Sequence, residues 1–266
     1  MVEKGLLSCR NLPAIPKFSN RIWQGGEAGF GCFQAGLACA KGYKHVMVFS
    51  PGMNIFFDLD GTISDPELGI TRCIQHALAA LDRPVPATHE LRFAIGPPLR
   101  GTFAQLLNST DQTEIGRAVA LYRERFSTIG LFENTLYDGV TAVLDELVTA
   151  GYCLTLVTAK PMPYATRIIE HFSLQSHFSR IYGSELNGRF DDKGELIEHV
   201  LRAESLSASR CVMVGDRIYD IHAAHRNGVK AIGALWGFGT REELGEADML
   251  CERPISLPAV LPYFAQ

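Results

Sequence analysis

The sequence predicts an α/β fold in which a doubly wound parallel sheet carries an all-helical insertion after its first strand. Two observations lead to this prediction. From residue 54 onward, short apolar runs alternate with helix-length amphipathic stretches, which is the pattern of parallel strands joined by crossover helices. Residues 66–135 break that alternation, because they contain helical patterns and no convincing strand.

The predicted strands are short and rich in Val, Ile, Leu or aromatic residues. Strands that are buried on both faces, as in a parallel sheet, have this composition. In chain order they are "NIFF" (54–57), "YCLTLVT" (152–158), "RIYGS" (180–184), "RCVMVGD" (210–216) and "KAIGAL" (230–235).

Helices are predicted between these strands and in the insertion. Two of them close on Gly151 and Gly228, and glycine is common just past a helix C-terminus. The insertion should form a small cap over the C-terminal edge of the sheet, where ligands bind in such folds. The predicted helices span 140–151, 162–172, 193–204 and 217–228 around the sheet, and 69–83, 98–108 and 114–130 in the cap.

The predicted domain organisation therefore has three parts. Residues 53–65 and 136–266 form the core domain, and residues 66–135 form the helical cap. Residues 1–52 show no comparable period, and we expect an N-terminal extension that is disordered or precedes the native start, with translation beginning at Met53. The alternative is a targeting or partner-binding tail.

Composition argues against two classes of partner. Lys and Arg number 25 against 29 Asp and Glu, a net charge of −4, and no basic stripe suits a nucleic acid polymer. No segment reaches the roughly 18 to 20 unbroken apolar residues of a membrane span. The seven cysteines are odd in number and scattered, without zinc-like spacing, so reduced thiols in the cytoplasm are expected.

The first strand ends in paired carboxylates, in the stretch "NIFFDLDGTISD" (54–65). Asp58 and Asp60 stand at i and i+2, so they should project to the same side. Gly61 permits a sharp turn, and Thr62 offers a hydroxyl and an N–H to the same spot. Carboxylates held this close repel, and a shared proton or a divalent cation resolves the repulsion. Taken alone, the motif also fits a turn with an Asp cap before a helix.

A second strand repeats this design in "VGDRIYD" (214–220). The strand ends in Asp216, and Asp220 follows about one helical turn later. Magnesium prefers hard oxygen ligands, so carboxylates from two neighbouring strand ends predict a Mg²⁺ site. Helix capping is the alternative for this motif alone.

Two further segments supply groups for an anion. In "TLVTAKP", Thr158 precedes Lys160, and Pro161 suits the first turn of the next helix. The hydroxyl and the backbone amides at the N-terminus of that helix are expected to form an anion site. Lys193 begins a later helix and could bind a phosphate while it offsets the aspartate charges. Each lysine taken alone also fits a solvated surface position.

These motifs, in this order, resemble those of the haloacid dehalogenase-like (HAD) phosphohydrolase superfamily. The resemblance rests on "FFDLDGT", "LVTAKP", Lys193 and "VMVGDRIYD", covers residues 54 to about 260, and implies a Rossmann-like core with a C1-type cap. "DPELGI", "IGPPL", "TAKP" and "GDRIYDI" followed by "GALWGFGTREEL" resemble the phosphoglycolate phosphatase-like branch, particularly its 5′-nucleotidase-like members.

The resemblance implies a role for each matching residue. Asp58 would be the nucleophile that forms an aspartyl-phosphate, and Asp60 would protonate the leaving alcohol and then activate water. Asp58, the Asp60 backbone carbonyl and Asp216 would hold Mg²⁺, and Asp220 would support the site directly or through water. The residues expected to bind the phosphoryl oxygens are Thr62, Thr158, Ala159 and Lys193.

The same residues distinguish between the alternative reactions. A dehalogenase typically lacks the second aspartate, so Asp60 favours a phosphatase. A phosphonate hydrolase would need a cap lysine, and residues 66–135 contain none. A sugar-phosphate mutase shares these groups and stays possible. A non-catalytic phosphate-binding protein has no need of both a nucleophile and an acid.

The substrate is predicted from the cap and from one departure in the motifs. Arg100 is expected nearest the site mouth, where it could pair with the carboxylate of phosphoglycolate or stack on a base, and Lys160 is a second tentative substrate residue. Phosphoglycolate phosphatases usually carry a "KPxP" segment, whereas this chain has "NGRFDDKGEL". Nucleoside 5′-monophosphates are therefore favoured as the small phosphomonoester substrate, with phosphoglycolate and sugar phosphates as alternatives. The sequence does not report the oligomeric state, and "WGFG" (236–239) fits a loop near the site or core packing.

Overall fold

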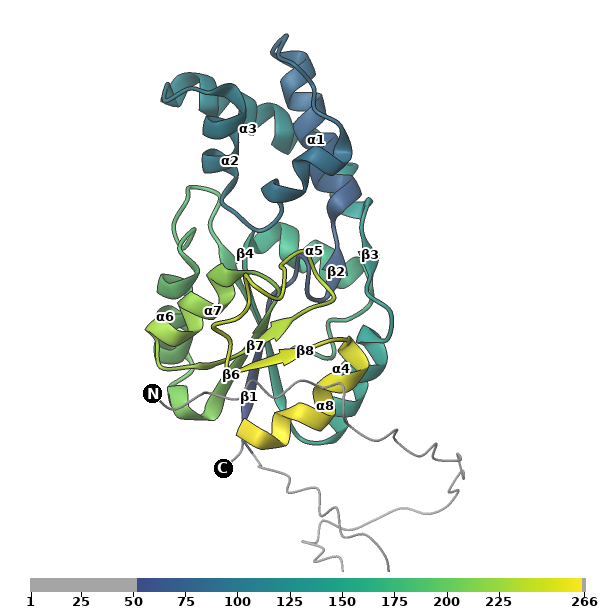
Figure 1. The fold of residues 1–266 in the computed structure, drawn as a ribbon, viewed down its shortest axis with the longest axis vertical. Helices are drawn as coiled ribbons and strands as arrows, with labels where there is room; N and C mark the ends of the chain where they lie inside the picture. Colours follow the sequence, from purple (N-terminus) through teal and green to yellow (C-terminus); the bar gives the residue numbers. More distant parts are fainter. Residues whose placement is uncertain (1–51, 265–266) are drawn as a thin grey trace, which may run out of the picture.

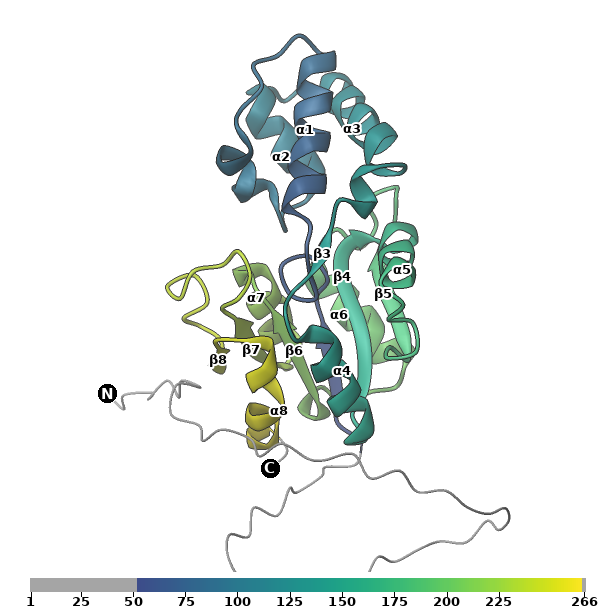
Figure 2. The same cartoon turned by 90° about the vertical axis from the view of Figure 1, so that its right-hand side faces the viewer.

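A computed structural model describes residues 52–264 of the chain. The N-terminal extension predicted at 1–52 lies outside the described residues, apart from Gly52. The described chain forms a sheet with helices on both faces and a group of helices beyond one end of the strands (Figures 1 and 2).

The sheet has six strands in the order β5-β4-β1-β6-β7-β8, and every neighbouring pair is parallel. From β1 the chain moves outward through β4 and β5, then returns to place β6 on the other side of β1. The strand order therefore reverses at β1, and ligands in such sheets bind at this reversal. The strands are β1 Asn54–Phe57, β4 Cys153–Pro161, β5 Arg180–Ser184, β6 Cys211–Gly215, β7 Lys230–Ala234 and β8 Met249–Cys251.

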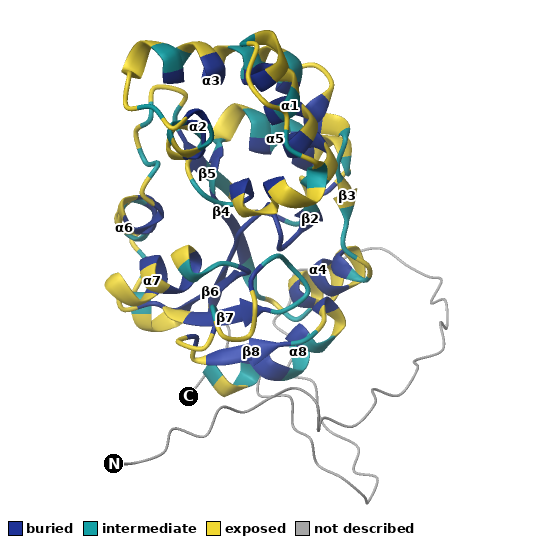
Figure 3. Ribbon diagram, turned by 45° about the horizontal axis from the view of Figure 1, so that its top comes forward, coloured by how far each residue is buried: buried dark blue, intermediate teal, exposed yellow. Residues whose placement is uncertain are grey.

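Alternate side chains of the strands enter two separate cores, as the two-residue period of a strand requires. In β1, Ile55 and Phe57 belong to the core that includes Leu144, whereas Phe56 belongs to the core that includes Ile197. Figure 3 shows β6, β7 and β8 mostly dark blue, while the helices combine buried and exposed residues. On the first face lie α4 Val140–Thr149, α5 Met162–His171 and α8 Leu257–Val260, and on the second lie α6 Lys193–Ala203 and α7 Ile218–Arg226.

The predicted cap segment is helical and lies beyond the C-terminal ends of the strands (Figures 1 and 2). It consists of α1 Glu67–Ala80, a 3₁₀ helix at Thr88–Ala94, α2 Leu99–Leu107 and α3 Gln112–Phe126. Aromatic contacts join two of these helices: the ring of Tyr122 meets Phe103 edge-on and stacks on Phe126. The 3₁₀ helix was not predicted, because its residues show no helical apolar period.

A two-stranded antiparallel ladder joins the two passages between core and cap. Ser64–Asp65 (β2) pairs with Thr135–Leu136 (β3), and the N–H of Tyr137 donates to the carbonyl of Ile63 at 3.2 Å. Short 3₁₀ helices complete the described chain at Gly130–Phe132, Ala208–Arg210, Pro254–Ser256 and Leu261–Phe264. Among the described residues, no helix has the length and apolar character needed to cross a bilayer.

Candidate active site

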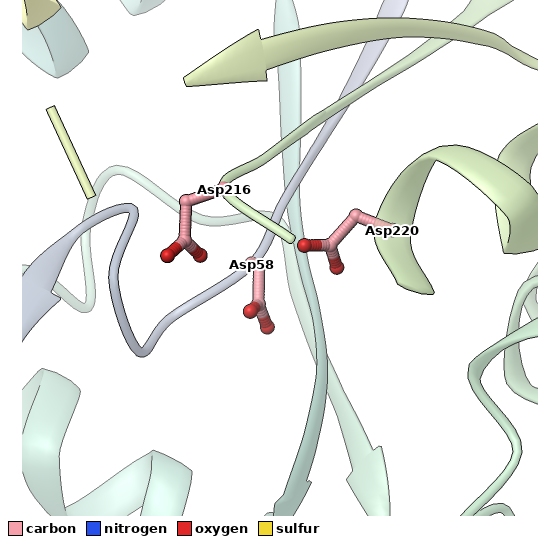
Figure 4. Close-up of side chains that lie close together, drawn as sticks. All are labelled: Asp58, Asp216 and Asp220. Atoms are coloured by element: carbon pink, nitrogen blue, oxygen red, sulfur yellow. The ribbon is translucent and has the colours of Figure 1, made fainter. Parts of the chain in front are cut away.

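Three carboxylates converge where the two central strands end. Asp58 directly follows β1, Asp216 directly follows β6, and Asp220 lies in the first turn of α7. The strands are in register, and the N–H of Asp58 donates to the carbonyl of Val214 at 3.0 Å. One oxygen from each carboxylate lies within 4.8 Å of the others, and all three residues are buried (Figure 4). The structure therefore brings together the acids that the sequence placed at separate strand ends.

Lys193 supplies positive charge to this cluster. It is the first residue of α6, and its Nζ lies 2.8 Å from Oδ1 of Asp58 and also pairs with Asp220. Burial alone would lower the pKa of Lys193, but the carboxylates of Asp220 and Asp58 raise it above its ordinary value. Burial raises the pKa of Asp220 to about 6, against the opposing effect of Lys193. As predicted from the sequence, the lysine lies beside the aspartates.

Asp216 accepts hydrogen bonds but forms no ion pair within the described part of the chain. Its Oδ2 accepts from the N–H of Phe238 at 2.9 Å, and its Oδ1 accepts from the hydroxyl of Thr62 at 3.4 Å. Burial, and then the nearby Asp220 and Asp58, raise the pKa of Asp216 well above its ordinary value. Three buried carboxylates with one lysine between them are a donor set that suits a hard divalent cation such as Mg²⁺.

Two glycines allow the loops to approach Asp216 closely. Gly61 has a positive φ of 84°, and a Cβ at this position would overlap the carboxylate of Asp216. A Cβ at Gly237 would overlap both Asp216 and the carbonyl of Gly61. The turn after β1 and the loop after β7 therefore enclose Asp216 only because both positions lack a side chain.

Asp60 forms a separate ion pair next to the cluster. Oδ2 of Asp60 lies 2.7 Å from Nζ of Lys160, near the C-terminal end of β4, and both side chains are buried. Within the described chain, Oδ1 of Asp60 is buried and has no hydrogen-bond partner. Burial raises the pKa of Asp60, and the nearby Lys160 opposes that rise. Nζ of Lys160 also lies 4.7 Å from the ring centre of Phe126 in the cap.

A cavity of about 160 Å³ opens above these groups, between the sheet edge and the cap. Asp58, Asp60 and Lys160 line its inner end, together with Thr158 and Ala159. Its aromatic wall consists of Tyr122, Phe126 and Tyr164. The lining also includes charged and polar side chains, namely Arg100, Arg123, Asn187 and Asp191. The predicted site residue of the cap, Arg100, thus lines the cavity, where its Nη2 donates to Oε1 of Gln112 at 2.7 Å.

The residues predicted to bind phosphate occupy different positions. Thr158 and Ala159 line the cavity, although β4 continues to Pro161 rather than ending at residue 158 as predicted. Thr62 is buried, its hydroxyl donates to Asp216, and its N–H donates to the carbonyl of Leu59 at 3.3 Å. The hydroxyl and the N–H of Thr62 therefore already donate to other groups, and phosphate binding by Thr62 stays a prediction.

The sequence motif indicates no separate role for Arg217, which lies beside the site. Its guanidinium contacts Glu243 and the backbone of Ile95. Those partners lie 26 residues ahead and 122 residues behind it, so no local pattern could have indicated them. The loop expected at 236–239 does approach the site, where Nε1 of Trp236 donates to the carbonyl of Thr62 at 2.9 Å.

The comparison with protein families agrees with this geometry. Residues 55–234 match the family model described as haloacid dehalogenase-like hydrolase. The chain belongs to this family. The match confirms the predicted superfamily and the α/β fold, and it spans every predicted acid and lysine of the site.

The individual relatives include phosphatases and a protein named as a kinase. A 5′-nucleotidase of Pseudomonas aeruginosa is 47% identical over 191 residues, which cover 72% of this chain and 86% of that protein. A tyrosine-protein kinase, PtkA of Mycobacterium tuberculosis, is 35% identical over 193 residues, 71% of this chain and 65% of that protein. Further matches include phosphoglycolate phosphatases at 28% and 29% identity.

A solved structure shows the same architecture. The crystal structure of a predicted phosphatase from Clostridium acetobutylicum superimposes with a TM-score of 0.76 at 34% identity and covers 80% of this chain and 99% of that one. Together with the family match and the 5′-nucleotidase relative, it confirms the prediction of a phosphoric monoester hydrolase of the HAD family.

Proposed function

We propose that the protein is a Mg²⁺-dependent phosphatase that hydrolyses nucleoside 5′-monophosphates through an aspartyl-phosphate on Asp58. The observation that carries the proposal is that Asp58 and Asp60 line the same cavity, directly beside Lys193 and the other two carboxylates. The substrate is supported by the 47% identity to a protein named 5′-nucleotidase.

In the first step, Asp58 attacks phosphorus and the ester oxygen leaves. The carboxylate of Asp58 forms the new bond, and Lys193 neutralises charge on the phosphoryl oxygens. Thr158 and the Ala159 backbone, on the neighbouring strand, hold the phosphoryl group in line for attack. Positioning and charge neutralisation are the main contributions that a protein makes to phosphoryl transfer.

Asp60 handles the proton in both steps. Lys160 holds one oxygen of Asp60, and the other is left without a partner within the described chain, so it is available to the leaving group. Asp60 gives a proton to the departing alcohol, then takes one from the water that hydrolyses the phosphorylated Asp58. A residue that works in both directions must stay in place between them, which the ion pair with Lys160 favours.

Mg²⁺ would be held by Asp58, Asp216 and the backbone carbonyl of Asp60, with Asp220 directly or through water. When bound, the ion supplies charge that offsets the carboxylates and orients the phosphoryl group. The donor set fits, because one oxygen each from Asp58, Asp216 and Asp220 lie within 4.8 Å of one another, and burial and the repulsion between these carboxylates raise the pKa of Asp216.

The walls of the cavity suit a nucleoside better than a small acid. Tyr122, Phe126 and Tyr164 give an aromatic surface of the kind that stacks on a base. Arg100 and Arg123 would pair with a carboxylate, so phosphoglycolate is the alternative substrate. A sugar-phosphate phosphatase or mutase, and a binding protein without turnover, are the remaining alternatives.

We further propose a cytoplasmic location and a small-molecule partner only, without nucleic acid or membrane. The location is supported by Cys73, Cys153, Cys211 and Cys251, which are free thiols in the described part of the chain.

Phosphate release tests the proposed function. Wild type, Asp58→Asn and the surface control Asp145→Asn would be assayed with nucleoside monophosphates, phosphoglycolate and sugar phosphates, with Mg²⁺ and with EDTA. We expect turnover only with Mg²⁺, highest on a nucleoside monophosphate, abolished by Asp58→Asn and unchanged by Asp145→Asn. Preference for phosphoglycolate would overturn the substrate assignment. No turnover by folded wild type would overturn the hydrolase proposal and favour a mutase, a binding role or transfer to another acceptor.

A further inference from the structure

We propose that Arg217 is a positioning residue that holds the cap loop closed over the active-site cavity and so sets the affinity for substrates with a large leaving group. The cap loop is residues 95–98, between the 3₁₀ helix Thr88–Ala94 and α2. The substrate part of this inference rests on the proposed function, whereas the closure part does not.

Arg217 is fixed from the core side. It lies between Asp216 and α7, and its Nε donates to Oε1 of Glu243 at 2.8 Å. The same Glu243 oxygen accepts from the N–H of Ile218 at 3.1 Å, so the carboxylate is itself anchored. The side chain of Arg217 is only 16% exposed. A guanidinium held this way points in one direction rather than sampling several.

That direction is toward the cap. Nη1 of Arg217 donates to the backbone carbonyl of Ile95, the first residue of the cap loop. The next residue, Gly96, has a φ of 102°, and a Cβ there would lie 3.1 Å from Cγ of Arg217. The cap loop therefore packs against the arginine as well as accepting its hydrogen bond.

The cap loop forms part of the substrate cavity. Gly96, Pro97 and Pro98 all line it, as do Asp58 and Asp60. Pro97 and Pro98 have no N–H, so this loop has few donors with which to hold itself in place. In Figures 1 and 2 the segment that leads into α2 descends toward the core. Its contact with Arg217 thus decides how closely one wall of the cavity approaches the reacting groups.

Two other arginines join core and cap through backbone carbonyls elsewhere in the structure. Nη1 of Arg123 donates to the carbonyl of Leu186 at 3.2 Å, and Nη1 of Arg167 donates to the carbonyl of Ser127 at 2.8 Å. Arg217 differs from them because it is joined directly to Asp216 and to the helix that carries Asp220. Closure of the cap loop is therefore tied to the same segment that carries two of the carboxylates.

The geometry requires arginine rather than any cation. The guanidinium serves Glu243 and Ile95 with two donors that diverge from one rigid plane. A lysine keeps the positive charge beside Asp216 but has a single head group, which cannot reproduce both bonds. The Arg217→Lys variant should therefore weaken closure of the cap loop while it retains the positive charge of the site.

The test compares wild type, Arg217→Lys and the control Arg202→Lys in the full chain. Arg202 pairs with Glu198 on the exposed face of α6, 75% exposed, so its substitution retains the charge at a site remote from the cavity. The rate of hydrogen exchange in peptides covering residues 93–103 measures closure of the cap loop. Calorimetric titration with Mg²⁺ alone measures the affinity of the carboxylate cluster for the ion. Steady-state kinetics with AMP and with ethyl phosphate report the effect of leaving-group size.

For Arg217→Lys we expect exchange in residues 93–103 to quicken and KM for AMP to rise, each at least about tenfold, since one hydrogen bond from a charged donor is lost. We expect kcat for AMP, KM for ethyl phosphate and the affinity for Mg²⁺ to stay within about twofold. A twofold change corresponds to only a small fraction of the free energy of such a hydrogen bond. Arg202→Lys should match wild type throughout.

Unchanged exchange in the folded Arg217→Lys protein would overturn the inference, and so would equal losses on both substrates accompanied by weaker Mg²⁺ binding. If wild type turned over neither substrate, the proposed function would fail while the exchange result still decided closure. Should Arg217→Lys not fold, Glu243→Ala removes the partner that aims the guanidinium. The same quickened exchange is then expected, and its absence would overturn the inference.

Discussion

Nζ of Lys160 lies 2.7 Å from Oδ2 of Asp60, while Oδ1 of Asp60 is buried without a hydrogen-bond partner in the described part of the chain. The pair crosses from the end of β4 to the turn after β1. The sequence suggested Lys160 as a tentative substrate residue. It does line the cavity, but its ammonium is already committed to a carboxylate, so positioning of Asp60 is the role that its contacts support.

Lys160→Met should reduce activity by releasing Asp60. We expect kcat/KM to fall by about 10² or more, the low end of what general acid–base catalysis contributes. The unfolding temperature should also fall, because the change leaves a buried carboxylate without its partner. Steady-state kinetics and thermal unfolding measure both effects. The matched control is Lys230→Met, which removes a surface lysine paired with Asp248. Wild-type kcat/KM in the Lys160 variant would contradict the positioning role.

Asp60→Asn should show a dependence on the leaving group. If Asp60 protonates the departing oxygen, an alkyl phosphate should lose about 10²- to 10⁴-fold in kcat. p-Nitrophenyl phosphate, whose leaving group needs no proton, should lose much less in its first step. Rapid mixing would then detect a burst of nitrophenol, because the second step still requires Asp60 to activate water. Equal losses on both substrates, without a burst, would show that Asp60 is not the acid.

Mg²⁺ should stabilise the protein through the three-carboxylate cluster. At about 100 times its Kd, a ligand specific for the folded state adds about 2.7 kcal/mol. Thermal unfolding should therefore shift upward with Mg²⁺ and return with EDTA. In Asp216→Asn the shift should vanish, while the metal-free unfolding temperature should not fall, since burial and like charges already raise the pKa of Asp216. A full Mg²⁺ shift in this variant would exclude Asp216 as a ligand.

Much of the site could be predicted because its groups sit at strand ends within local motifs. Asp58 and Asp216 follow buried apolar runs, and parallel strands bring their carboxyl ends to one edge of the sheet. Lys193 begins a helix of clear amphipathic period, as expected. These positions follow from the apolar pattern of the strands and helices and from the parallel direction of the strands. A single sequence indicates both.

The remaining features of the fold and the site depend on contacts between segments that are distant in the sequence. β8 has three residues, and β2 and β3 have two each, which is too short for any periodic signal. They are strands because a neighbouring segment offers backbone partners. The ion pair of Lys160 with Asp60 and the reach of Arg217 to Ile95 have the same origin. Such contacts are set by tertiary packing, so local residue patterns could not indicate them.

Substitution of alanine for glycine should change stability in opposite directions at Gly237, which lies against Asp216, and at Gly101, which lies in a cap helix. In Gly237→Ala, the new Cβ would overlap the carbonyl of Gly61 and the side chain of Asp216, so the loop must withdraw. We expect lower stability and loss of the Mg²⁺-dependent shift in unfolding temperature. Gly101, inside α2, has no atom within 4 Å of an added Cβ. Gly101→Ala should instead stabilise the protein by about 0.5–1 kcal/mol, because alanine loses less conformational entropy in a helix. Calorimetric Mg²⁺ titration and denaturant unfolding distinguish the two variants. A Gly237→Ala protein that binds Mg²⁺ with wild-type affinity would show that the loop after β7 does not shape the metal site.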